Sequence, residues 1–135
     1  MASDKVEFEL VSPERLLLSE QVDMVVVPGA EGDFGVLPRH APLISTLRPG
    51  VIRVFEGREV KERIFVAGGF AEVTAERCTV LAEEAVPVGD IDAGKIEQEL
   101  KDLGEDLADA KTDEEKAAIA KRIKVREAMR AATAA

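Results

Sequence analysis

Aromatic side chains are scarce in this sequence of 135 residues, which contains no Trp, no Tyr and only 5 Phe. A hydrophobic core must therefore be built from Val, Leu, Ile and Ala. The aromatic platforms on which nucleic-acid bases stack are missing, and the formal net charge of −9 repels phosphate backbones. The composition argues against a nucleic-acid partner. The length allows one domain with a real core, or a small domain with an appendage.

Cysteine and histidine, the residues of many nucleophilic and metal sites, occur once each, as Cys78 and His40. A single cysteine excludes an internal disulfide and a cysteine metal cluster, and we expect it to be a small buried strand residue. The motifs HExxH, GxSxG, CxxC and the P-loop pattern do not occur. We therefore predict no catalytic residue, no metal site and no cofactor, and a protein that is not an enzyme.

Long apolar runs are also lacking. No stretch approaches the roughly 18 residues that a membrane-spanning helix needs, and the opening MASDKVEFEL has no basic region followed by an apolar one. We expect no signal peptide and no direct membrane insertion, so any link to a membrane has to come through a partner.

The sequence does contain a series of short strand patterns. Val6, Phe8 and Leu10 alternate with acidic residues, which is typical of a strand with one solvent-facing side. Further strand-like runs, separated by turn residues, occupy 22–27, 51–55, 60–67, 71–74 and 79–83. Because no helical crossover fits between strands so closely spaced, we predict an antiparallel sandwich or barrel over residues 1–89.

A polar, glycine- and proline-rich loop is predicted over residues 28–42. Three of its glycines are spaced GxxGxxG, but no helix follows that could direct its N-terminus at a phosphate. We interpret Glu31 and Asp33 as solvated acids of a mobile turn, unless a partner presents cations to them.

The pattern becomes helical over residues 90–135. Apolar residues recur every three or four positions at Ile96, Leu100, Leu103 and Leu107, on a helix of roughly 20 residues. Asp90 or Asp92 can cap its start, and Thr112 with Glu115 forms a capping box for a second helix that runs to the end of the sequence. The short connection predicts an antiparallel helical hairpin.

Charge is divided between the two predicted helices. Residues 90–115 hold eleven acidic and three basic residues, whereas 116–135 hold six basic and one acidic. Exposed ion pairs contribute only about 0.2–1 kcal/mol each, so we expect the hairpin to be docked marginally. With no catalytic signature beside it, the pattern is that of a protein that binds other proteins.

Three segments share a family resemblance: VPGAEGDFGVLPRHAPLISTLRPG at 27–50, FVAGGFAEVTAERCTVLAEEA at 65–85 and the closing hairpin. Together they resemble the epsilon subunit of bacterial F-type ATP synthases, the counterpart of the mitochondrial delta subunit. The resemblance covers nearly the whole sequence. It implies a flattened, ten-stranded β-sandwich at the foot of the central stalk and a rotor subunit that couples rotation of the c-ring to the catalytic head.

The resemblance also implies partners and contact residues for the sandwich. One face is expected to bind the gamma subunit, and the lower rim is expected to meet the polar loops of the c-ring. The residues that match the family's ring-facing segment are Glu31, Gly32, Asp33, Arg39 and His40. The implied location is peripheral, on the cytoplasmic face of the bacterial inner membrane.

In this family the hairpin can lie folded or extend up the stalk and block ATP hydrolysis. The basic residues that could then meet an acidic loop of the catalytic alpha/beta subunits are Lys121, Arg122, Lys124, Arg126 and Arg130. Some members bind ATP through an I/L-D-x-x-R-A motif, and this sequence reads IDAGKI at 91–96. Lysine replaces the arginine and isoleucine the alanine, which predicts at most a weak ATP site at Asp92, Lys95, Arg122 and Arg126.

Two other interpretations fit the same periodicities. A stand-alone β-sandwich adaptor with a helical tail would leave the long match at 27–50 to chance. A nucleotide-sensing protein would need a basic pocket between hairpin and sandwich. Co-purification distinguishes them, because a rotor subunit should co-purify with gamma.

Overall fold

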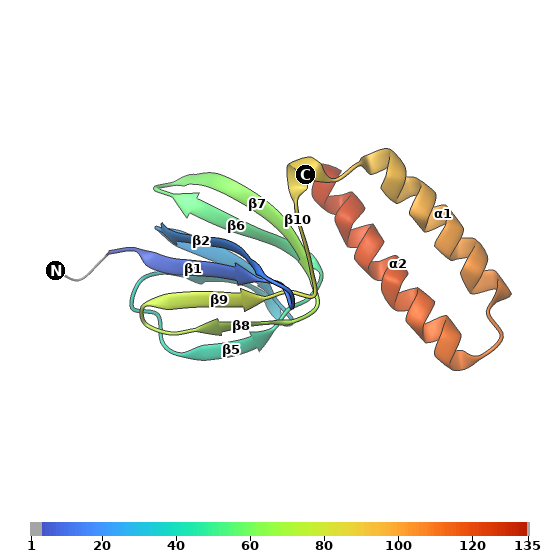
Figure 1. Cartoon of the computed structure of the whole chain (residues 1–135), viewed down its shortest axis with the longest axis horizontal. Helices are drawn as coiled ribbons and strands as arrows, with labels where there is room; N and C mark the ends of the chain where they lie inside the picture. Colours follow the sequence, from blue (N-terminus) through green and yellow to red (C-terminus); the bar gives the residue numbers. More distant parts are fainter. Residues whose placement is uncertain (1–3, 135) are drawn as a thin grey trace. The chain divides into compact units, whose positions relative to one another are not determined.

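A computed structural model describes residues 4–134 of the protein (Figure 1). The protein divides into two compact units, Met1–Pro87 and Val88–Ala135. The first contains the strands and the second the helices. The sequence-based boundary at Gly89 stays a prediction.

Ten strands form two five-stranded sheets in the first unit, which confirms the predicted β-sandwich. The first sheet has the order β2-β1-β9-β8-β5, with bounds Leu16–Val22, Val6–Val11, Arg77–Leu81, Phe70–Val73 and Leu43–Thr46. The second has the order β10-β7-β6-β3-β4, with bounds Glu84–Pro87, Glu59–Ala67, Gly50–Glu56, Met24–Gly29 and Gly32–Val36. Neighbouring strands are antiparallel except β1 and β9, which are parallel.

The core of the sandwich is aliphatic, as the scarcity of aromatics predicts. In β1 the alternation holds, because Val6, Phe8 and Leu10 are buried while the acids between them are not. Phe8 packs with valines, leucines and isoleucines of both sheets in one continuous cluster. Among residues 4–134, no polar or charged residue is buried. Burial of aliphatic area is therefore the main stabilising term of the first unit.

The segment 28–42 is not the single polar loop that the sequence predicts. It begins inside β3, turns, and returns as β4, in which Gly29 pairs opposite Gly32 and Val25 opposite Val36. The prediction was wrong because β4 is an edge strand that buries only Val36 and therefore shows no alternation of its own. The sequence patterns also predicted no strand at β5 or β10, and they placed the second strand at 22–27 and so missed β2.

A glycine pair makes the tight connection from β7 to β8. Gly68 and Gly69 have positive φ values of 72° and 94°. A Cβ atom on Gly69 would lie 1.8 Å from the carbonyl oxygen of Leu81. Only glycine allows this close approach of the two backbones.

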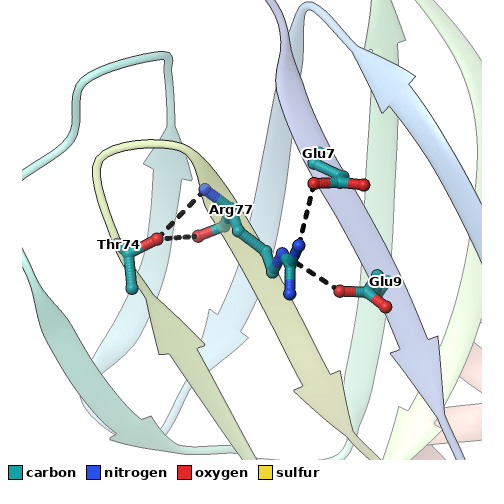
Figure 2. A network of polar contacts seen from close by, with 4 residues as sticks. All are labelled: Glu7, Glu9, Thr74 and Arg77. Atoms are coloured by element: carbon teal, nitrogen blue, oxygen red, sulfur yellow. Dashed lines mark hydrogen bonds and ion pairs between the residues drawn. The ribbon is translucent and has the colours of Figure 1, made fainter.

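Strands β1 and β9 carry charged residues on the outward side of the first sheet. Arg77 on β9 lies between two acids of the parallel strand β1, with its Nη2 3.1 Å from Glu7 and its Nε 3.2 Å from Glu9 (Figure 2). The hydrogen bond to Glu7 and the charges of the nearby acids raise the pKa of the Arg77 guanidinium above its ordinary value. Thr74 closes the turn before β9, because its hydroxyl accepts a hydrogen bond from the Arg77 backbone amide.

The second unit consists of a short 3-10 helix, Val88–Asp90, and two helices, α1 (Ala93–Asp109) and α2 (Asp113–Ala134). Of the two predicted caps for α1, Asp92 is the one observed, and its side chain accepts a hydrogen bond from the Lys95 amide at 3.2 Å. At the start of α2, the Thr112 hydroxyl accepts from the Glu115 amide at 3.1 Å. The predicted helical hairpin is confirmed.

Ion pairs join the two helices of the hairpin. Arg126 on α2 lies 2.7 Å from Glu99 on α1, and Arg130 lies 3.4 Å from Glu97. Within the described part of the hairpin, the buried residues are few: Ile96, Leu103, Met129 and Ala132. Basic residues of α2 therefore pair directly with acidic residues of α1, in agreement with the division of charge seen in the sequence.

Candidate functional site

The tip of the β3–β4 hairpin, formed by Ala30 and Glu31, is the first part of the candidate site. Glu31 is exposed. The turn needs glycine on both sides: Gly32 has a φ of 143°, and a Cβ atom on Gly29 would lie 2.8 Å from the Gly32 carbonyl oxygen. Glycines at both positions therefore allow the backbone to reverse tightly and leave the Glu31 carboxylate facing solvent.

The segment Thr46–Arg48 holds this tip in place. The Ala30 amide donates to the Thr46 carbonyl at 2.9 Å, and the Arg48 amide donates to the Pro28 carbonyl at 3.0 Å. The Leu47 amide also donates, to the Gly69 carbonyl at 3.1 Å. The tip hairpin of the second sheet is thus connected through this segment to the first sheet.

Two arginines form ion pairs with the carboxylate of Asp33 on β4. Arg48 bonds one carboxylate oxygen through Nη2, and its Nη1 donates to the Gly29 carbonyl at 2.7 Å. Arg53 on β6 lies 3.8 Å from the other carboxylate oxygen. Asp33 is therefore an ion-paired strand residue and not the solvated acid of a mobile turn.

A groove of about 600 Å³ lies beside the tip, between residues 29–34 of the β3–β4 hairpin and residues 43–46 of β5. Both β4 and β5 are edge strands of their sheets. On β5, Ile44 is 70% exposed, more than any other large hydrophobic residue among those the structure describes. An exposed apolar side chain next to a groove and unpaired strand edges is typical of a surface that another protein covers.

The structure separates the five residues expected to face the c-ring into two groups. Glu31, Gly32 and Asp33 lie at or next to the tip, whereas Arg39 and His40 follow the opposite end of β4. The strand has 5 residues, which correspond to about 16 Å. One small loop of a partner could not contact both groups.

Arg39 has its own local partners at that opposite end. It adopts a positive φ of 65°, and its amide donates to the Ala75 carbonyl at 2.7 Å. Its guanidinium lies 3.6 Å from Asp4. The His40 Nδ1 lies 2.6 Å from the Ala41 carbonyl oxygen. These contacts fix the β4–β5 connection against the β8–β9 turn.

The candidate residues of the hairpin also fall into groups. Arg126 and Arg130 are engaged with acids of α1. The side chains of Lys121, Arg122 and Lys124 are exposed, and none of them forms a hydrogen bond or ion pair with another residue of the described range 4–134. A basic surface on the middle of α2 therefore remains available to a partner.

The four residues of the predicted ATP site lie at different levels of the hairpin. Asp92 is occupied as the cap of α1. Because Arg126 pairs with Glu99 in the antiparallel hairpin, Arg122 lies roughly level with residue 103 of α1. Lys95 is eight residues before that level, about 12 Å along the helix. The positions of the three basic residues are therefore spread over about 12 Å along the hairpin.

Reactive chemistry is not supported by the geometry. Cys78 is fully buried, and burial raises the pKa of its thiol to about 12, so the thiolate form is suppressed at neutral pH. Across residues 4–134, no cluster of His, Cys, Asp and Glu is arranged to hold a metal ion. In the same range, no helix combines the length and apolar character needed to cross a membrane.

Sequence reasoning missed Arg48 and Arg53, which hold Asp33. Fifteen residues separate Asp33 from Arg48, and no motif spacing links them. The only sequence signal was the presence of two acids, Glu31 and Asp33, in the glycine-rich segment and of two bases, Arg48 and Arg53, shortly after it.

The described residues form a β-sandwich with an exposed groove and a fixed polar tip, followed by a helical hairpin, and this arrangement is that of a protein that binds other proteins. A family model for the β-sandwich domain of the ATP synthase delta/epsilon chain matches residues 5–88, and one for the C-terminal domain of the ATP synthase epsilon chain matches residues 92–135. The protein belongs to the ATP synthase epsilon chain family, whose members are non-catalytic subunits of the complex.

Individual relatives agree over nearly the full length. The ATP synthase epsilon chain of Paramagnetospirillum magneticum is 58% identical over 132 residues, 98% of this protein and 99% of the relative. The epsilon chain of Rhodospirillum rubrum is 54% identical over 130 residues, 96% of this protein and 97% of the relative. The predicted family resemblance is confirmed.

Solved structures share the fold at low sequence identity. A subunit of the Euglena gracilis mitochondrial ATP synthase, solved as OSCP/F1/c-ring, matches with a TM-score of 0.83 at 23% identity, covering 96% of this protein and 82% of that subunit. A subunit of the Tetrahymena thermophila mitochondrial ATP synthase central stalk/c-ring matches with a TM-score of 0.67 at 17% identity, covering 98% and 99%. Both likenesses concern the fold alone.

Proposed function

We propose that this protein is a rotor subunit of the central stalk of an F-type ATP synthase, where the sandwich binds gamma and the Glu31 tip meets the c-ring. Family membership supports a place in the complex. The Tetrahymena assembly that shares the fold is a central stalk with a c-ring. The proposed location is peripheral, on the cytoplasmic face of the bacterial inner membrane, with attachment through the ring.

The observation that carries this proposal is the fixed tip with a groove beside it. A rotor contact must transmit torque, so its surface should be ordered before the partner binds. The tip meets this requirement through the Ala30–Thr46 and Arg48–Pro28 backbone bonds. Less conformational entropy is then lost on binding. The groove with Ile44 offers an apolar contact area next to the polar tip.

For Arg39 and His40 we propose a contact different from that of Glu31. Because they lie at the other end of β4, they cannot meet the same small loop as Glu31. If the tip faces the ring, these two residues are expected to contact another part of the stalk or a different ring loop.

The hairpin supports a second, conditional contact. The exposed cations Lys121, Arg122 and Lys124 are available to an acidic loop of the catalytic alpha/beta subunits. Extending α2 toward such a loop breaks two partly exposed ion pairs to α1 and uncovers the few buried residues of the hairpin. Such pairs contribute little to stability. We therefore propose that the hairpin inhibits ATP hydrolysis when it leaves its folded position.

Mixing the protein with its cognate gamma subunit tests the central claim. We expect a one-to-one complex by size-exclusion chromatography and native mass spectrometry. Failure to bind gamma would favour a stand-alone adaptor, and a rise in thermal stability with ATP alone would favour a nucleotide sensor.

The ring contact is tested separately by Glu31→Lys. Glu31 is exposed, so we expect stability to change by no more than about 0.5 kcal/mol while proton-driven ATP synthesis in reconstituted membranes falls. Glu59→Lys, the same charge reversal at an exposed position of β7, is the control and should leave synthesis unchanged. Unimpaired synthesis with Glu31→Lys would contradict the ring contact.

A further inference from the structure

The guanidinium of Arg48 connects the two strands that carry the tip. Nη1 donates to the carbonyl of Gly29, the last residue of β3, and Nη2 bonds the carboxylate of Asp33 on β4. The Arg48 backbone amide bonds Pro28 as well. One residue outside the hairpin thus holds both of its strands immediately before and after the turn.

This connection matters because β4 has few other supports. It is the edge strand of its sheet and pairs only with β3. Asp33 lies on the exposed face of β4. The guanidinium Nη2 of Arg53 on β6 lies 3.8 Å from the Asp33 carboxylate. Without Asp33 and the two arginines, no side-chain bond would connect the β4 end of the turn to the segment around residue 48, and only the β3–β4 ladder, the packing of Phe34 and Val36 and the Ala30–Thr46 backbone bond would remain.

We propose that Arg48 and Asp33 are positioning residues that fix the direction of the Ala30–Glu31 tip for its contact with the c-ring, and that Asp33 does not contact the ring itself. This inference rests on the proposed function of the tip. The side chains of Arg48 and Asp33 are 41% and 45% exposed. At that exposure the ion pair adds little to global stability, so its main effect is on geometry.

The chemistry requires arginine at position 48. A planar guanidinium presents two separate nitrogen atoms in a fixed fork and can bond the Gly29 carbonyl and the Asp33 carboxylate at once. Lysine keeps the charge but has one nitrogen and a flexible stem. Arg48→Lys is therefore the most informative variant, because it preserves charge while removing the fork.

The first measurement uses amide hydrogen exchange in the full-length protein. In Arg48→Lys and in Asp33→Asn, exchange of the Ala30 amide should become at least about tenfold faster because local opening is easier. The amides of β6 and the melting temperature should not change. Arg58→Lys, at an exposed position of the β6–β7 turn, is the matched control. Unchanged Ala30 exchange in both variants would overturn the inference.

The second measurement is proton-driven ATP synthesis in reconstituted membranes, together with binding to gamma. We expect Arg48→Lys to lower synthesis severalfold while gamma binding stays as in the unsubstituted protein. If the tip loosens but synthesis is normal, and Glu31→Lys still impairs synthesis, the positioning role is wrong and the ring contact stands. If Glu31→Lys also has no effect, the ring contact itself is wrong, and the positioning role with it.

Discussion

The sandwich and the hairpin are stabilised by different interactions. The sandwich encloses one continuous apolar cluster that includes fully buried residues from both sheets, such as Phe8 and Ile52. The hairpin buries few side chains and holds its helices together with caps and cross-helix ion pairs. Apolar burial contributes far more per residue than exposed ion pairs. The same protein therefore combines a rigid unit with one that can rearrange at low cost.

This difference suits the proposed roles of the two units. A torque-bearing contact needs a rigid frame, and the tip is built on the sandwich. A regulatory element needs two conformations of similar free energy, and the marginal unit is the one that carries the exposed cations of α2. If the packing determines stability in this way, substitutions and truncations should affect the two units very differently.

Separating the two units should give the largest effect. We expect a fragment of residues 1–89 to fold with a cooperative thermal transition and to bind gamma, because the whole core cluster lies within it. A fragment of residues 90–135 should be largely unfolded in water, since two short helices with little buried area cannot offset their conformational entropy. Circular dichroism distinguishes the outcomes. A soluble but unfolded 1–89 fragment would show that the predicted boundary is wrong.

Core substitutions in the full-length protein should show the same contrast at single residues. Phe8→Ala removes a fully buried ring and should lower the unfolding free energy of the sandwich by about 3–5 kcal/mol. Leu103→Ala, at a 5% exposed position of α1, should cost about 2 kcal/mol, and only in the helices. Native-state hydrogen exchange resolves the two units. Equal losses in both would contradict the comparison.

Replacing a glycine with alanine should lower the stability of the sandwich but raise the stability of the hairpin. Gly69→Ala places a Cβ atom 1.8 Å from a backbone oxygen at a φ of 94°, so we expect a loss of about 3 kcal/mol or more. Gly104 lies in α1, where an added Cβ atom would have no neighbour within 4 Å, so Gly104→Ala should stabilise the helix by up to about 1 kcal/mol. Denaturant unfolding measures the effect of Gly69→Ala, and the hydrogen-exchange rates of the α1 amides measure the effect of Gly104→Ala. A tolerated Gly69→Ala would mean that the two backbones are not fixed at this distance.

Much of this architecture could be predicted from local patterns. The alternation at Val6, Phe8 and Leu10 marks a half-buried strand, and Asp92 and Thr112 mark helix starts because capping chemistry is local. Strand β4 could not be predicted in this way. Its residues have weak strand preference, and pairing with β3 holds it in place.

The candidate site shows the same limit. The exposure of Glu31 follows from its place in a turn and was predictable. The bonds of Arg48 to Gly29 and Asp33 were not, because they depend on a bridge between Gly29 and Leu47 that forms only when the strands assemble. Arg39 was grouped with Glu31 because both match the family's ring-facing segment, whereas strand β4 places them at its opposite ends.

We expect the smallest effect on stability from ATP. If ATP bound and stabilised the folded hairpin, the difference in stability between the sandwich and the hairpin would become smaller. The basic residues that would have to converge are spread along the hairpin, and Arg126 is already paired with Glu99. Lys95 offers a point charge where the family motif has the planar fork of arginine, and Asp92 is engaged in capping. We therefore expect dissociation no tighter than roughly millimolar, so that about 0.1 mM Mg-ATP adds less than about 0.1 kcal/mol to stability. Isothermal titration of the full-length protein measures this, with Lys95→Arg as the matched variant that restores the motif arginine. Saturable micromolar binding by the unsubstituted protein would show that Lys95 suffices and that the hairpin responds to nucleotide.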